Sequence, residues 1–184
     1  MKKLLLHICC APCAVYVVRK LMEEYDVTGF FYNPNIHPVK EYEFRVEETK
    51  KVAEKLNWKV ILSEYDIKNW FKLIRGHEKD PERGERCSIC FNMRFDKVFQ
   101  YAKENDFDMV ASTLSISPYK AIDQINREGY LLSRKYGVDF LPENFKKRDG
   151  FKIGTVMSHD LGIKHQDYCG CVFSLRDRNR QLKK

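Results

Sequence analysis

The stretch LLLHICCAPC, residues 4–13, joins an apolar run to three cysteines, two of which are adjacent. Residues 4–8 are almost continuously apolar, which is typical of a strand buried on both faces of a parallel sheet. Apolar residues then recur with helical spacing, so residues 14–25 are predicted to form an amphipathic helix. Ligands bind beyond the carboxyl ends of strands in open α/β sheets, so function is expected at Cys9 and Cys10.

Strands and helices continue to alternate along the chain. Further strands are predicted at residues 27–33, 58–62, 108–113 and 138–141, and further helices at 40–57, 87–104 and 117–135. The last of these helices is predicted from Ser117-Pro118, read as an N-cap followed by a first-turn proline. This order predicts an α/β protein, a three-layer Rossmann-like domain with a parallel sheet and right-handed crossovers.

The chain is predicted to form a single domain. It has 184 residues, 43% of them hydrophobic, which suits one core, and it contains no repeat, low-complexity segment or Gly/Ser linker. Residues 66–86 hold a short helix around Trp70 and a polar stretch, and are predicted to form a loop insertion over a site. The domain 1–184 ends in a cysteine-bearing segment, residues 165–184.

Cysteine content and hydropathy indicate the compartment. His7 interrupts the apolar run near the start, which does not match a secretory signal, and no stretch approaches the roughly 18 apolar residues of a membrane span. We therefore expect a cytoplasmic protein without a membrane partner. Seven cysteines in a reducing compartment favour metal ligation or redox catalysis over a disulfide framework.

The net charge of +7 arises from 33 Lys and Arg against 26 Asp and Glu. The excess gathers at residues 146–148 and in a tail containing Arg176, Arg178, Arg180, Lys183 and Lys184. Such clustering is typical of a nucleic-acid partner, whereas a solvated surface rich in ion pairs is the alternative.

A Cys-x-x-Cys pair, Cys87 and Cys90, lies at the start of a predicted helix, where the helix dipole favours thiolate over thiol. Together with Cys9 and Cys10, these thiolates can complete a tetrahedral zinc site or hold an iron–sulfur cluster. We favour the cluster, because adjacent cysteines make a poor zinc knuckle unless the backbone turns sharply. Four buried cysteines acting as small apolar residues are the structural alternative.

Two further cysteine patterns allow redox chemistry. Cys10 and Cys13, read as CAPC before a helix, match a thioredoxin-like site, but this reading leaves Cys87 and Cys90 unexplained. The second pattern is a Cys-Gly-Cys sequence near the C-terminus.

Cys169 and Cys171 flank a glycine that permits a tight bend, so the two sulfurs can form a redox-active disulfide or bind a second iron or other metal. The neighbouring Asp167 and Tyr168 are candidates to supply a proton or a ligand. Both residue types are also common as capping or packing groups.

Five motifs in order, LLHICCAPC, FFYNPNIHPVKEYEFR, RCSIC, STLSISPYKAID and HQDYCGCVFS, resemble the QueH-type epoxyqueuosine reductases over about residues 4–175. The resemblance implies a fold similar to the adenine nucleotide hydrolase-like (PP-loop/HUP) domains and an iron–sulfur cluster without cobalamin. It implies reduction of the epoxide of epoxyqueuosine at the wobble position of tRNA with a GUN anticodon, the last step of queuosine synthesis.

By the same resemblance, Cys9, Cys10, Cys87 and Cys90 match the ligands of a [4Fe-4S] cluster, and Cys169 and Cys171 match a redox-active pair. Cys13 receives no role, and the electron donor is not identified. The basic groups would hold the tRNA while the modified base stacks on Tyr119, Trp70 or Phe31, although each of these aromatics is individually more often a core residue than a stacking platform. A thioredoxin-like dithiol oxidoreductase and a non-catalytic zinc-stabilised RNA-binding module are the alternative functions.

Overall fold

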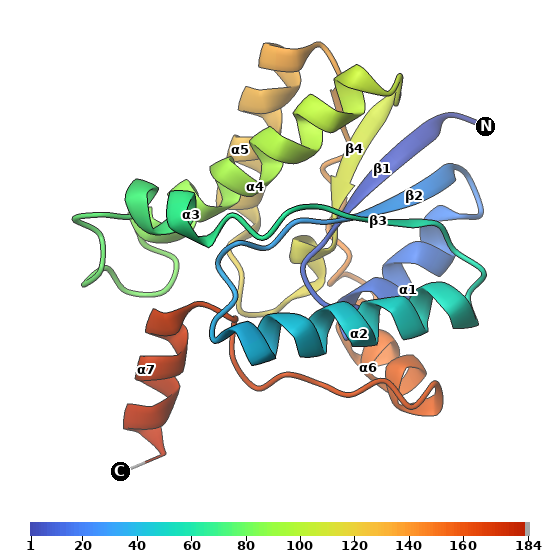
Figure 1. Ribbon diagram of the computed structural model, residues 1–184. Helices are drawn as coiled ribbons and strands as arrows, with labels where there is room; N and C mark the ends of the chain where they lie inside the picture. The colour runs from blue at the N-terminus through green and yellow to red at the C-terminus, as the bar shows by residue number, and fades with distance from the viewer. Residues whose placement is uncertain (183–184) are drawn as a thin grey trace.

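The computed structural model describes residues 1–182 and contains a five-stranded parallel sheet (Figure 1). The strands are β1 (Lys3–Ile8), β2 (Asp26–Phe31), β3 (Val60–Leu62), β4 (Met109–Ser112) and β5 (Asp139–Phe140). Their spatial order is β3-β2-β1-β4-β5, and every neighbouring pair is parallel. The predicted α/β class and parallel sheet are confirmed.

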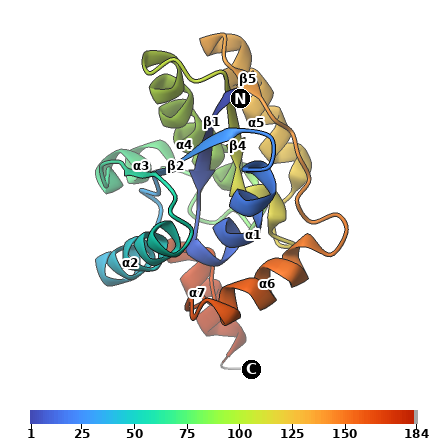
Figure 2. The same ribbon diagram turned by 90° about the vertical axis from the view of Figure 1, so that its right-hand side faces the viewer.

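Helices cover both faces of the sheet, which gives the three predicted layers (Figures 1 and 2). They are α1 (Ala11–Leu21), α2 (Val39–Lys55), α3 (Ile67–Leu73), α4 (Glu85–Glu104), the 3-10 turn η1 (Thr113–Ile116), α5 (Ile122–Tyr136), α6 (Gly150–Asp160) and α7 (Val172–Gln181). In β1, Leu4 and Leu6 pack in the core beneath α1, whereas Leu5 packs in the core beneath α4. Within residues 1–182, no helix is long and apolar enough to cross a membrane.

The strand order places the cysteine-rich loop at the point where the sheet reverses its direction of winding. β1 is the central strand, with β2 on one side and β4 on the other. Cys9 follows β1 and Thr113 follows β4, so both lie at the carboxyl edge of the sheet at its topological switch point. This is the position where open α/β sheets bind ligands.

Two predicted helix starts are wrong. Helix α1 begins at Ala11 rather than residue 14, because Cys10 is extended and the following proline fits a first helical turn. Helix α5 begins only at Ile122, because the backbone N–H of Tyr119 donates to Ser117 Oγ at 3.3 Å and closes a turn instead of a helix cap. Helices α6 and α7 were not predicted.

Helix α5 packs closely on β5 at a glycine. A Cβ atom at Gly129 would lie 2.4 Å from Cε1 of Phe140, so the ring occupies the space of a side chain. We expect Gly129→Ala to lower the free energy of unfolding by about 1–3 kcal/mol through overpacking, although alanine is the better helix former. Urea denaturation measures this, with Arg134→Ala on the exposed face of the same helix as the control. A Gly129→Ala protein as stable as wild type would contradict the close packing.

Candidate functional site

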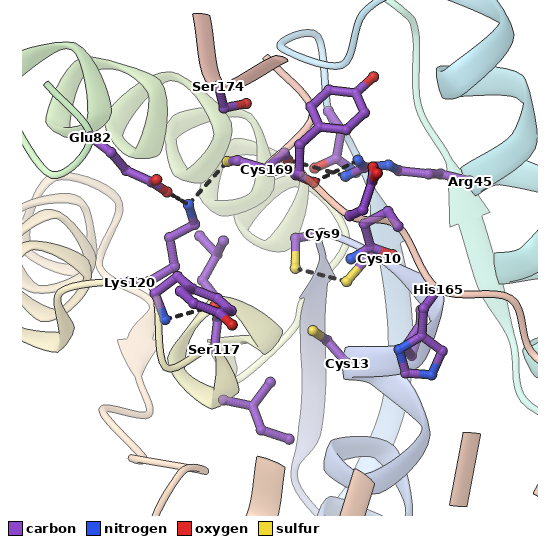
Figure 3. A pocket seen from close by; sticks show the side chains of 18 of the residues that line it. Cys9, Cys10, Cys13, Arg45, Glu82, Ser117, Lys120, His165, Cys169 and Ser174 are labelled. Carbon is purple, nitrogen blue, oxygen red and sulfur yellow. Dashed lines mark hydrogen bonds and ion pairs between the residues drawn. The ribbon is translucent and has the colours of Figure 1, made fainter. Parts of the chain in front are cut away.

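Three sulfurs gather where β1 passes into α1. The Sγ atoms of Cys9, Cys10 and Cys13 all lie within 4.8 Å of one another, and those of Cys9 and Cys10 are 3.6 Å apart (Figure 3). Within residues 1–182, no other group of three or more His, Cys, Asp or Glu side chains is as close. The adjacent side chains of Cys9 and Cys10 therefore converge, and Cys13 joins them from the first turn of α1.

The surroundings of this thiol group favour one thiolate. Thr113 Oγ1 donates to Cys9 Sγ at 3.3 Å and accepts from the Cys9 backbone N–H at 3.1 Å. The hydrogen bond between the Cys9 and Cys10 side chains lowers the pKa of Cys9 well below its usual range. Hydrogen bonds to Cys10 and Cys9, together with burial, raise the pKa of Cys13. A thiolate is the form that binds soft metals, so the arrangement suits a metal centre.

The thiol group opens into a cavity of about 600 Å³. Cys9, Cys10 and Cys13 line one side, and Cys169 from the C-terminal segment approaches from another (Figure 3). Helices α6 and α7 contribute further lining residues, among them Thr155. A cavity of this size accommodates a small molecule or a single nucleoside turned out of an RNA strand.

Cys87 and Cys90 occupy the first turns of α4, as predicted. The Arg83 backbone N–H donates to Cys87 Sγ at 3.3 Å, and burial raises the pKa of Cys87 to about 11. Cys90 is buried in the apolar cluster against which Cys9 and Cys87 also pack. The structure thus brings both residues to the core around Cys9, but neither belongs to the three-thiol group or lines the cavity.

The sulfurs of Cys169 and Cys171 have different surroundings. Cys169 Sγ accepts a hydrogen bond from Lys120 Nζ at 3.0 Å and lines the cavity. Cys171 is buried at the start of α7, where its Sγ accepts from the Ser174 backbone N–H at 3.3 Å. Burial raises the pKa of Cys171. Both are free cysteines.

Asp167 and Tyr168 also line the cavity, and each already has a partner. The Asp167 carboxylate forms an ion pair with Arg178, and the Tyr168 hydroxyl donates to the carbonyl of His37. Burial raises the pKa of Tyr168 to about 12. The tyrosine is therefore a protonated phenol that contacts the backbone of the loop before α2.

Arg45, which sequence reasoning missed, fixes the C-terminal segment above the cavity. Its guanidinium donates to the Cys169 carbonyl at 3.1 Å and to the Tyr168 carbonyl at 3.0 Å. The His37 backbone N–H donates to the Gly170 carbonyl at 2.7 Å. Gly170 has φ +115°, and a Cβ there would lie 3.0 Å from the Arg45 guanidinium, so the position requires glycine.

Lys120 was also missed, although it lies in the motif STLSISPYKAID. Its buried ammonium donates to Glu82 Oε1 at 2.6 Å and to Cys169 Sγ at 3.0 Å (Figure 3). Burial alone would lower the pKa of Lys120, but Cys169 and Glu82 raise it, so the side chain is a fixed cation. No local pattern marks such a residue, because its partners are distant in sequence.

The expected aromatic platform is corrected in part. Trp70 and Phe31 are 1% and 0% exposed, so they belong to the core and the expectation that they stack on a base is wrong. Tyr119 is 66% exposed and lines the cavity. Among the predicted basic residues, Lys147 and Arg148 are exposed on the loop before α6, whereas Lys183 and Lys184 lie outside the described residues.

Comparisons with known proteins agree with one another. The family described as epoxyqueuosine reductase QueH matches residues 4–177. Proteins named epoxyqueuosine reductase QueH from Histophilus somni and Thermotoga maritima are 46% and 35% identical, over 97% and 98% of this chain and 74% and 94% of their own lengths. Among solved structures, the U34-tRNA thiolase NcsA from Methanococcus maripaludis with its [4Fe-4S] cluster is similar, with a TM-score of 0.57 and 13% identity. The match covers 98% of this chain and 65% of the thiolase, which is less than two thirds of the thiolase. It confirms the predicted fold class.

Proposed function

The chain belongs to the epoxyqueuosine reductase QueH family, and we propose that it reduces the epoxide of epoxyqueuosine in tRNA with a GUN anticodon to give queuosine. The observation that carries the proposal is the shared cavity of about 600 Å³, lined by Cys9, Cys10 and Cys13 on one side and Cys169 on another. The cavity lies at the switch point of the sheet, has room for a nucleoside, and contains the thiols that a reduction requires.

We propose that Cys9, Cys10, Cys87 and Cys90 hold a [4Fe-4S] cluster, with Cys13 as the alternative ligand that the geometry introduces. The donor set fits, because the sulfurs of Cys9 and Cys10 lie within 4.8 Å of each other. Cys90 is buried in the apolar core against which Cys9 and Cys87 also pack. The structurally similar thiolase, which contains such a cluster, supports the proposal. A bound cluster would supply electrons one at a time.

Removing the epoxide oxygen as water consumes two electrons and two protons. Oxidation of the Cys169 and Cys171 thiols to a disulfide releases two electrons and two protons, so the dithiol can balance the reaction. The Lys120 ammonium holds the Cys169 sulfur at the cavity, and Asp167 and Tyr168 are proposed to relay the two thiol protons to the leaving oxygen. An electron donor of unknown identity then returns the disulfide to the dithiol. Elemental analysis tests whether a second metal is bound near this pair.

The test of the function is direct reduction of the modified tRNA. Protein purified without oxygen is incubated with dithionite and epoxyqueuosine-containing tRNA, and the digested nucleosides are separated by liquid chromatography and mass spectrometry. We expect a product lighter by one oxygen atom that co-elutes with queuosine. An iron- and sulfide-containing protein that leaves the epoxide intact would overturn the proposal. A colourless, metal-free protein would favour the dithiol oxidoreductase, and one with a single zinc the RNA-binding module.

The tRNA is proposed to bind at basic residues beside the cavity, which would place the protein in the cytoplasm. Lys147 and Arg148 are exposed on the loop that leads into α6, a helix that lines the cavity. Arg180 on α7 is also exposed, at 72% of its side chain. These cations can contact phosphates while Tyr119 offers an exposed ring to a base.

We expect the double variant Lys147→Ala, Arg148→Ala to bind tRNA about tenfold more weakly and to flatten the dependence of log Kd on log salt by roughly 1.5 units, because two phosphate contacts are removed. Fluorescence titration at several salt concentrations measures both quantities. The matched control is Arg134→Ala, Lys135→Ala at the end of α5, at the opposite edge of the sheet. Equal affinities and salt slopes for the two double variants would remove this surface from the tRNA site.

A further inference from the structure

Arg94 on α4 is a buried cation without a carboxylate partner. Arg94 is only 2% exposed, and one of its guanidinium nitrogens donates a hydrogen bond to Asn33 Oδ1 at 2.6 Å. The Nε atom is buried and has no hydrogen-bond partner. Within residues 1–182, no Asp or Glu oxygen lies within 4.0 Å of its guanidinium nitrogens.

The other buried cations around the cavity are neutralised by acids. Arg45 is 3% exposed and pairs with Glu41 at 2.8 Å, and Lys120 is 8% exposed and pairs with Glu82 at 2.6 Å. A guanidinium keeps its proton in a protein, and a buried charge without a counter-ion is strongly destabilising. An anion other than a carboxylate of the described chain would therefore stabilise Arg94.

Thiols from both predicted pairs lie beside Arg94 in the fold. Arg94 and Cys9 line the same cavity, and Cys90 lies one helical turn before Arg94 on α4. Thiolates at these two positions would be the anions nearest to hand for the guanidinium.

Arg94 also fixes the backbone beside the thiol group. The Asn33 amide, which accepts from Arg94, donates through Nδ2 to the Ile8 carbonyl at 2.8 Å. Ile8 is the last residue of β1 and directly precedes Cys9. A chain of two hydrogen bonds therefore ties the guanidinium to the point where the sheet ends and the cysteines begin.

We propose that Arg94 is a positioning residue that supplies the counter-charge of the thiolate-ligated cluster and raises its reduction potential. The inference rests on the proposed function, because it requires the cluster. A cluster held by four thiolates is anionic, and accepting one electron adds another negative charge. A fixed cation in a buried site stabilises the reduced form more than the oxidised form, and both net charge and hydrogen bonds to sulfur set such potentials.

The test compares the reduction potential of the loaded wild-type protein with that of Arg94→Gln, which keeps a donor for Asn33 but loses the charge. Anaerobic titration with dithionite, followed by electron paramagnetic resonance, measures the potential without substrate. We expect one-electron reduction to become about tenfold less favourable or more, which corresponds to about 59 mV. Arg94→Lys should keep the wild-type potential. Lys97→Gln is the control, because it removes a half-buried charge, paired with Glu64, that lies on the same helix but does not line the cavity.

Each outcome decides the proposal. Wild-type protein without iron and sulfide would refute the proposed cofactor, and Arg94 would lose its role with it. An intact cluster whose potential is the same in wild type and Arg94→Gln would overturn the Arg94 proposal alone. If Arg94→Gln folds but does not assemble the cluster, assembly of the cluster in Arg94→Lys supports the role of Arg94 as a counter-charge. If neither variant assembles the cluster, the Arg94 proposal is overturned. If Arg94→Gln does not fold, a reduction potential of Arg94→Lys that differs from that of the wild type overturns the Arg94 proposal.

Discussion

Cys9→Ser protein purified without oxygen is expected to contain about a tenth or less of the wild-type iron and sulfide and to lose turnover. Cys9 has the lowest thiol pKa of its group and contacts Cys10, so it is the first thiolate available to a metal. Loss of a group that only orients a ligand typically lowers metal affinity by roughly 10- to 100-fold. Loss of the ligand itself lowers the affinity further. Elemental and sulfide analysis, with visible absorbance, measures the effect.

The same measurement on the other cysteines separates two ligand sets. Cys87→Ser and Cys90→Ser should lose iron if the predicted set is correct, whereas Cys13→Ser should retain it. The reverse pattern would assign the metal to the three-thiol group of Cys9, Cys10 and Cys13. As a control, the free energies of unfolding of metal-free Cys9→Ser and metal-free wild type should agree within about 1 kcal/mol, since the substitution is nearly isosteric.

The location of the site could be predicted because it depends on local patterns. The apolar residues 4–8 identify a buried strand, and cysteines directly after such a strand must lie at the carboxyl edge of the sheet. The position of Cys13 could not be predicted as well. It depends on the extended conformation of Cys10, which starts α1 three residues earlier than the apolar periodicity indicates.

The charged residues around the site could not be predicted because their partners are far away in the sequence. Arg45 binds carbonyls 123 and 124 residues later, and Lys120 binds a sulfur 49 residues later. Arg94 binds an amide 61 residues earlier. Periodicity and spacing describe neighbours along the chain, so contacts made only when the α2, α4 and C-terminal segments meet leave no local signal.

Cys169→Ser and Cys171→Ser are each expected to keep the iron and sulfide of the wild type and to lower turnover about a thousandfold or more. Neither variant can form the disulfide whose formation balances the two electrons of the epoxide reduction. Because the two thiols act as a unit, the double variant should be no less active than either single variant. Single-turnover assays on epoxyqueuosine-containing tRNA, with reductant in excess, measure this loss.

The control for the dithiol is Ser174→Ala, which removes a hydroxyl beside Cys171 but leaves both sulfurs in place. The backbone N–H of residue 174 still donates to the Cys171 sulfur in this variant, so turnover should fall by less than about tenfold. Full turnover by the double cysteine variant with an intact cluster would contradict the dithiol role and leave all electrons to be delivered from the cluster side. A fall in iron content together with turnover would instead identify Cys169 and Cys171 as metal ligands, because a thiol that serves only as an electron store does not affect assembly.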